Sequence, residues 1–202
     1  MTNTISTNHR IALFLKELGL LAPAYREFAM HCIAMAPGYV FTNCPSSSSG
    51  KYHPTNELGP DGTVRHTRKV VAVANALTTA MGLQHYRDVI VTAAIVHDLR
   101  KQGLRRKGYT VSNHPALAAD LVNAVATRCP GLIPTRCAKL IAHCAGYHYG
   151  AWGTGEYAIA HLAGIAPREV LAHLRASDMS APALAVFAAD YIVSRREVGS
   201  LL

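Results

Sequence analysis

The chain has 202 residues and a mass of 21.7 kDa, which suits one compact domain. Half of its residues are hydrophobic and 16% are charged, which excludes a disordered chain, and no run of about 18 apolar residues indicates a membrane span. The formal net charge of +8 favours anionic partners such as nucleotides, phosphate esters or nucleic acid.

The cysteines and the amino-terminal segment indicate the cellular compartment. The five cysteines are odd in number and form no C-x-x-C pair, so neither a disulfide framework nor a structural zinc knuckle is expected. The opening residues, MTNTISTNHR, lack the charged-then-apolar layout of a signal peptide. We therefore expect a cytoplasmic protein without membrane association.

The first predicted elements form an N-terminal helical extension over residues 1–36. Within it, Ile11, Leu15 and Leu18 lie one turn apart and predict a helix. Residues 37–63 differ because their prolines, glycines and serines predict one long loop. A loop of this length in a compact domain is more often functional than incidental.

Apolar patterns predict helices over most of the remaining chain. Val70, Val73, Leu77 and Met81 have the spacing of a helix that is buried on one face. The run VIVTAAIV, residues 89–96, is apolar on every side and predicts a central buried helix. Further helix starts are expected where a proline suits the first turn, at Pro115, Pro134, Pro167 and Pro182.

A second loop, residues 146–156, is rich in glycine and aromatic residues. No alternating apolar and polar stretch is long enough for a sheet, and neither an internal repeat nor an interdomain linker is visible. The sequence therefore predicts an all-α fold and a single domain over residues 1–202.

Histidines and aspartates fall at the ends of these predicted helices. His66 opens the helix that runs to Met81, and the pair His97-Asp98 closes the buried helix. Burying such a pair is unfavourable without a partner, and a metal ion is the usual partner. We therefore expect several helix ends to meet at one polar pocket. The other residues of this kind are His114, His143, His148 and Asp178.

The order H…HD…H…H…D resembles the HD-domain superfamily of metal-dependent phosphohydrolases. Four strings carry the resemblance: GKYHP…GPDGTVRHT, VTAAIVHDLRK, NHPALAADLV and HLRASDMSA. Together they extend from about residue 51 to residue 180. The resemblance implies a helical HD core over about residues 51–181.

The resemblance also implies two divalent metal ions per chain that share one carboxylate ligand. The first ion is expected on His66, His97, Asp98 and Asp178. The second ion is expected on Asp98, His114 and either His143 or His148, a choice that stays open. Neutral imidazoles and carboxylates suit Mn, Fe, Co, Ni or Zn.

The expected catalytic residues are Asp98 and Lys101, which follows three residues later and is implied to contact a phosphate oxygen. Further substrate contacts are expected from His53 in the long loop, Arg105 in the basic run after the HD pair, and Trp152 in the second loop. Additional candidates are Glu57, for orienting water or the second metal, and Tyr149, for stacking on a base.

The expected function is hydrolysis of a phosphate ester or anhydride bond in a small nucleotide, as by a nucleotidase or a nucleoside triphosphate hydrolase. Nothing in the chain resembles an accessory domain for long nucleic acids, which favours a small substrate. Three alternatives stay open: a phosphodiesterase for cyclic or dinucleotides, a nuclease, and a non-catalytic nucleotide sensor. A nuclease would lose affinity steeply as salt rises. Self-association into a homo-oligomer also stays open.

Overall fold

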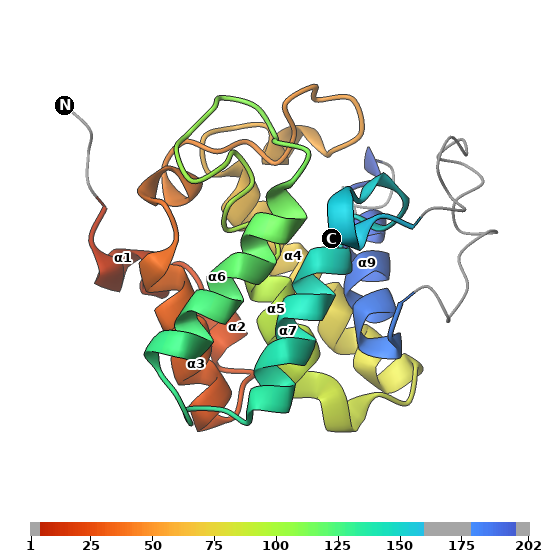
Figure 1. Ribbon diagram of the computed structural model, residues 1–202. Helices are drawn as coiled ribbons and strands as arrows, with labels where there is room; N and C mark the ends of the chain where they lie inside the picture. The colour runs from red at the N-terminus through yellow and green to blue at the C-terminus, as the bar shows by residue number, and fades with distance from the viewer. Residues whose placement is uncertain (1–4, 160–178, 197–202) are drawn as a thin grey trace.

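The computed structural model describes residues 5–159 and 179–196. Within these residues the chain is helical and contains no strand, which confirms the predicted all-α fold. Figure 1 shows α4, α5, α6, α7 and α9 gathered beside the N-terminal helices. The α-helices are α1 (Thr7–Ala12), α2 (Leu15–Leu18), α3 (Pro23–Met35), α4 (Gly62–Ala80), α5 (Arg87–Val96), α6 (His114–Arg128), α7 (Thr135–Tyr147) and α9 (Ala181–Val193). The 3₁₀ turns are η1 (Gly38–Phe41), η2 (Thr55–Glu57), η3 (Gln84–Tyr86), η4 (Gly150–Trp152) and η5 (Gly155–Tyr157).

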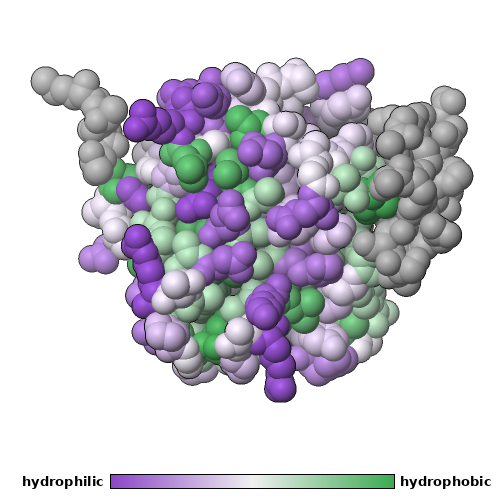
Figure 2. Space-filling model, viewed as in Figure 1, coloured by the Kyte–Doolittle hydropathy of each residue, from purple (hydrophilic) through white to green (hydrophobic). Residues whose placement is uncertain are grey.

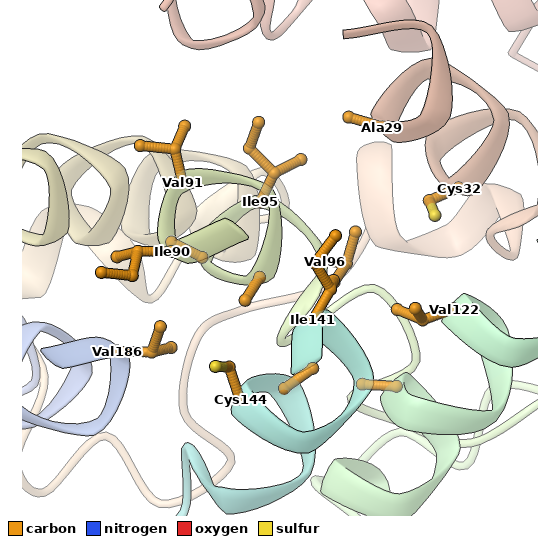
Figure 3. Packing of buried hydrophobic residues seen from close by; sticks show 14 of the residues in the cluster. Ala29, Cys32, Ile90, Val91, Ile95, Val96, Val122, Ile141, Cys144 and Val186 are labelled. Carbon is orange, nitrogen blue, oxygen red and sulfur yellow. The ribbon is translucent and has the colours of Figure 1, made fainter. Parts of the chain in front are cut away.

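Helix α5 lies at the centre of the fold because its side chains are apolar on every side. All residues from Val89 to Val96 are buried, and the helix packs against α3, α4, α7 and α9. Figure 3 shows Ile90 and Val96 of α5 in one buried cluster with Val186 of α9 and Ile141 of α7. The prediction of a central buried helix is thus confirmed, and its C-terminal end brings His97 into the interior.

Prolines mark several helix starts, as predicted. Pro115 and Pro182 lie in the first turns of α6 and α9, and α7 begins directly after Pro134. The hydroxyl of Ser180 also accepts a hydrogen bond from the Ala183 N–H at 3.3 Å and so caps α9. The helix start expected at Pro167 lies outside the described residues.

The N-terminal helix predicted from Ile11 to Leu18 is interrupted, which corrects the sequence prediction. The break between α1 and α2 is at Leu13 and Phe14, where Phe14 leaves helical geometry. Its ring is buried and meets the Phe41 ring edge to face at 6.4 Å. Burying this aromatic side chain outweighs the benefit of a continuous helix.

Helix α4 begins at Gly62, one turn before His66, which corrects the expected start at His66. Asp61 and Arg65 form an ion pair across this first turn at 2.6 Å. A Cβ atom at Gly62 would lie 1.8 Å from the Glu57 carbonyl oxygen. Only glycine therefore lets the start of α4 pack this closely on the preceding loop.

Two long segments, residues 42–61 and 99–113, lie at the same end of the helical bundle (Figure 1). Hydrogen bonds join them, since Ser48 Oγ accepts from the Thr110 N–H at 2.6 Å, and Arg106 Nη2 donates to Asn43 Oδ1 at 3.2 Å. On the face seen in Figure 2, hydrophobic residues form small patches among hydrophilic ones.

In the described part of the chain, no helix has both the length and the apolar character needed to cross a membrane. The five cysteines are free thiols, in agreement with the absence of a disulfide framework.

Candidate metal centre

Five predicted ligand residues meet in the interior because they occupy the ends of converging helices. His66 lies near the start of α4, and His97 and Asp98 lie at the end of α5. His114 begins α6, and His148 follows the last residue of α7. All five side chains are at most 1% exposed.

Three of the imidazoles are held in the same way by the backbone. In His97, His114 and His148, the Nδ1–H donates a hydrogen bond to a carbonyl oxygen three residues earlier. Because a carbonyl oxygen only accepts, each neutral ring must carry its proton on Nδ1 and present the lone pair of Nε2. The acceptors are Ala94, Val111 and Ala145, at 2.7, 2.7 and 2.6 Å.

The three Nε2 atoms point toward the Asp98 carboxylate. His97 Nε2 lies 3.5 Å from Oδ2, while His114 Nε2 and His148 Nε2 lie 3.4 and 3.7 Å from Oδ1. The buried His97 Nε2 and Asp98 Oδ1 have no hydrogen-bond partner. Acceptor atoms that converge without donors between them are the arrangement that a metal ion satisfies.

His114 and His148 give the strongest indication of a cation site. Their Nε2 atoms lie 3.1 Å apart, so a hydrogen bond between them would require one ring to carry a second proton. Burial opposes this protonation: it lowers the pKa of His114 to about 4, and with the neighbouring His97 it lowers the pKa of His148 to about 3. Near neutral pH, a divalent cation is therefore the group that fits between these nitrogens.

His66 is held differently, by carboxylates on both ring nitrogens. Nδ1 lies 3.1 Å from Glu57 Oε2, and Nε2 lies 2.9 Å from Asp190 Oδ1. Burial alone would lower the pKa of this imidazole, but the two carboxylates outweigh burial and raise the pKa to about 9. The ring therefore donates from both nitrogens when no metal is bound.

Glu57 is fully buried and connects this histidine to the long loop. Besides His66, its Oε2 accepts a hydrogen bond from His53 Nδ1 at 3.1 Å, and its Oε1 lies 3.2 Å from Lys69 Nζ. Burial favours the neutral acid, yet hydrogen bonds from His53 and His66 outweigh it and lower the Glu57 pKa to about 2. Ser46 donates to the Glu57 carbonyl from both its N–H and its hydroxyl, which fixes the residue in place.

Three groups of described side chains have the composition and spacing of metal sites, with ligand atoms within 4.8 Å of one another, and one of them is His53, Glu57 and His66. The other two share Asp98, so one carboxylate can bridge two ions. Of these two, the first group is His66, His97 and Asp98. The second group is Asp98, His114 and His148.

Lys101 pairs with Asp98 Oδ2 within the same interior. Its burial would lower the pKa of the ammonium, but the Asp98 charge more than compensates, so the pKa is raised and the lysine stays charged. Among the described residues, Lys101 is the cation nearest to the Asp98 carboxylate, while the protonated His66 ring lies farther away, with its Nε2 4.0 Å from Asp98 Oδ2.

A cavity of about 340 Å³ opens onto this cluster. Lys101, His148 and Asp190 line its inner part together with His53 of the long loop, while Trp152 belongs to the aromatic wall. The other lining residues are Ser46, Ser47, Ser48, Ser49, Tyr52, Thr110, Tyr149, Phe187, Tyr191, Ser194 and Arg195.

Some predicted site residues lie elsewhere. His143 is one turn before the end of α7, where its ring packs on Tyr147 at 4.7 Å and its Nε2 accepts a hydrogen bond from the Ser180 N–H at 3.5 Å. Arg105 is exposed and does not line the cavity. Asp178 lies outside the described residues.

Asp190 is the site residue that the sequence reasoning missed. It lies on α9 in the segment AVFAADYIV, where it is the one charged residue among apolar neighbours. That isolation in a buried helix is a signal that could have identified it, since an unpaired carboxylate is rarely buried. Burial alone would raise the pKa of this carboxyl, but the imidazoles around it, His66 first among them, outweigh burial and lower the pKa.

Comparison with known proteins agrees with this geometry. The family model for the HD domain matches residues 63–194, an interval that contains both of the candidate groups that share Asp98, together with Asp190. No curated protein and no solved structure matches the chain significantly.

Proposed function

Because the chain belongs to the HD-domain family of metal-dependent phosphohydrolases, we propose that it hydrolyses a phosphate ester or anhydride bond of a small nucleotide. The observation that carries the proposal is the cavity that leads from an aromatic wall down to Lys101 and the histidine–aspartate cluster. A cavity of about 340 Å³ suits a ligand of mononucleotide size and is too small for a duplex.

Two ions are proposed, with Asp98 bridging them. Three imidazoles with free Nε2 lone pairs, and an orphaned carboxylate oxygen, fit cations of the manganese-to-zinc series. When bound, such ions supply an activated water, because coordination lowers the pKa of water from 15.7 to about 7. The proposed ligands of the first ion are His66, His97, Asp98 and Asp190. The proposed ligands of the second ion are Asp98, His114 and His148.

The remaining side chains have positioning and electrostatic roles. Lys101 keeps its charge at the inner end of the cavity, where it would contact a phosphate oxygen and stabilise the charge that develops in the transition state. Glu57 accepts from His66 Nδ1 and so orients that ring toward the centre. Tyr149 and Trp152 offer faces for a nucleobase.

The test is a product-release screen with Mn, Co, Ni, Mg or Zn. The panel contains ribo- and deoxynucleoside mono-, di- and triphosphates, cyclic mono- and dinucleotides, dinucleoside polyphosphates and single-stranded oligonucleotides. Chromatography separates phosphate from pyrophosphate release. We expect metal-dependent turnover of one nucleotide class. This turnover should be lost in Asp98→Asn and retained in Lys107→Gln, because Lys107 is an exposed lysine of the segment 99–113.

The other outcomes distinguish the alternatives. Turnover only of oligonucleotides, falling steeply with salt, would identify a nuclease. Cleavage only of cyclic or dinucleotides would identify a phosphodiesterase. Metal binding without turnover of any compound would contradict the enzymatic proposal and favour a sensor.

A further inference from the structure

Arg195 is a cation of the cavity that the metal centre does not use. It lies two residues after the end of α9 and lines the cavity. Its guanidinium carbon lies 4.4 Å from the centre of the Tyr191 ring and 5.1 Å from that of the Tyr52 ring. Two aromatic contacts hold the guanidinium in a defined place, which reduces the entropy that it loses when it binds a ligand.

The charge of Arg195 has no carboxylate partner within the described residues. No acidic side chain there lies within ion-pair distance of it, whereas Lys101, the other cation of the cavity, is paired with Asp98. The Nε–H of Arg195 is buried, and no described atom accepts a hydrogen bond from it. A buried donor of this kind is unfavourable unless a bound group supplies the acceptor.

Helix α9 sets the distance between Arg195 and the metal centre. Phe187, Asp190, Tyr191 and Ser194 line the cavity, and they lie on one face of the helix by their spacing. Asp190 contacts His66, and Arg195 follows five residues later. At 1.5 Å of rise per residue, Asp190 and Val193, the last residue of α9, differ by roughly 4 to 5 Å along the helix axis, and Arg195 lies two residues beyond Val193.

We propose that Arg195 binds a second phosphate of the substrate, at the opposite end of the cavity from the phosphate that is hydrolysed. This inference rests on the proposed function, and it narrows the substrate to a nucleotide with two separated phosphates. The planar guanidinium fork matches two phosphate oxygens, which a lysine would not do. Two sources have this chemistry: the far phosphate of a 5′-polyphosphate chain, and a phosphate on the other side of the sugar.

The chain contains a built-in reporter for the test. Trp152 is its sole tryptophan, it lines the cavity, and its ring stacks on Tyr191 with a centroid distance of 6.1 Å and an angle of 10°. Because Tyr191 also contacts Arg195, a ligand at this end should change the tryptophan fluorescence.

The experiment measures ligand binding to the metal-free full chain by tryptophan fluorescence, so no hydrolysis is needed. The three probes are adenosine 5′-monophosphate, adenosine 5′-triphosphate and adenosine 3′,5′-bisphosphate. We expect the triphosphate, the bisphosphate or both to bind about tenfold or more tightly than the monophosphate, a gain that corresponds to one additional charge-assisted hydrogen bond. The probe that gains affinity identifies the source of the second phosphate.

Arg195→Gln should remove this advantage and leave monophosphate binding within about threefold. The matched control is Arg128→Gln, which makes the same charge change on an exposed residue at the opposite end of α6 from His114. Arg195→Lys should recover only part of the advantage because it keeps the charge and loses the fork. Circular dichroism of each variant checks that it is folded.

Equal affinity of the three probes for the unaltered chain would overturn the inference, as would an advantage that survives Arg195→Gln or an absence of binding by all three probes. The proposed function fails separately, when no nucleotide is hydrolysed with metal present. If an additional phosphate raised the affinity through Arg195 but the protein hydrolysed no nucleotide, the phosphate subsite would be supported and the enzymatic proposal would be contradicted.

Discussion

Asp98 Oδ1 is a buried carboxylate oxygen with no hydrogen-bond donor, and two imidazole lone pairs face it. Lys101 offsets part of the negative charge from the Oδ2 side. Because Oδ1 has no hydrogen-bond donor, its charge is not compensated, and we therefore expect a second ion on this side of the carboxylate.

His143 lies in α7 and His148 directly follows this helix, so the two histidines can be compared in one experiment. His148 is in the cluster with Asp98, while His143 packs on Tyr147. We predict that His148→Ala lowers the metal content from two ions to about one and the turnover by roughly 100-fold or more, since even loss of an outer-shell partner lowers affinity or activity 10- to 100-fold. His143→Ala should keep both ions. Elemental analysis and rate measurements test this, and the reverse pattern would assign the second site to His143.

Asp190 and Asp178 form a second pair that one experiment separates. Asp190 Oδ1 contacts His66, whereas Asp178 was expected from the sequence alone and lies outside the described residues. We predict that Asp190→Asn loses the first ion because the amide carries no charge for the cation. Metal content is measured for both variants. Loss of metal in Asp178→Asn but not in Asp190→Asn would assign the ligand to Asp178.

The choice between such pairs could not be made from the sequence. His143 and His148 differ by five residues, so they point to different sides of a helical turn, and only the packing of α7 against α5 and α9 decides which side faces the centre. Asp190 is not part of a recognisable sequence motif, unlike His97 and Asp98, which lie in VTAAIVHDLRK. Its role depends on α9 packing against α4, a contact between distant segments.

Single elements were more predictable because their signals are local. The apolar run of α5 and the proline starts of α6, α7 and α9 follow from the sequence directly. The break at Phe14 could not be predicted, because it depends on a contact with Phe41 from another segment. Two cations of the cavity were expected, Lys101 and Arg105; Lys101 lines the cavity, whereas the other lining cation is Arg195 and not Arg105.

At the scale of elements, Gly62 joins the long loop to the start of α4. A methyl group there would collide with the Glu57 carbonyl, so we predict that Gly62→Ala destabilises the fold by about 1–3 kcal/mol and lowers turnover by shifting Glu57 away from His66. Chemical denaturation and rate measurements test both effects.

The control for this variant is Gly82→Ala, after α4. Gly82 has φ +68°, and a Cβ atom at this position would meet open space, so its replacement should cost roughly 1–2 kcal/mol through backbone strain alone. Turnover below the melting range should stay unchanged. If Gly62→Ala behaved in the same way, the loop would not position Glu57 for the centre.

For the whole molecule, the buried histidines make the stability of the metal-free protein depend on pH. The pKa values of His114 and His148 are lowered to about 4 and about 3, so the unfolded chain binds more protons than the folded chain as pH falls from 6.5. Stability should therefore fall toward acid. The His66 pKa is raised to about 9, so its contribution is complete below pH 6.5 and is lost as pH rises toward 9.

We predict that the melting temperature of chelator-treated protein is highest near pH 6.5 and declines on both sides. In His114→Ala, the melting temperature should fall less between pH 6.5 and 4.5, because this variant lacks one of the two histidines whose pKa is lowered by burial. Calorimetry between pH 4.5 and 9 tests this. A melting temperature that stays constant from pH 4.5 to 6.5 would contradict the assignment of these rings as buried and neutral.

In the proposed enzyme, Asp98 bridges two ions, and both ions are needed to hydrolyse the nucleotide. A titration of metal-free protein with Mn²⁺ tests this bridge when bound metal per chain and phosphate release from the best nucleotide are measured on the same samples. We predict little turnover at one bound ion and full turnover at two. Full turnover at one bound ion, or no turnover at any occupancy, would contradict a phosphohydrolase in which Asp98 bridges two ions.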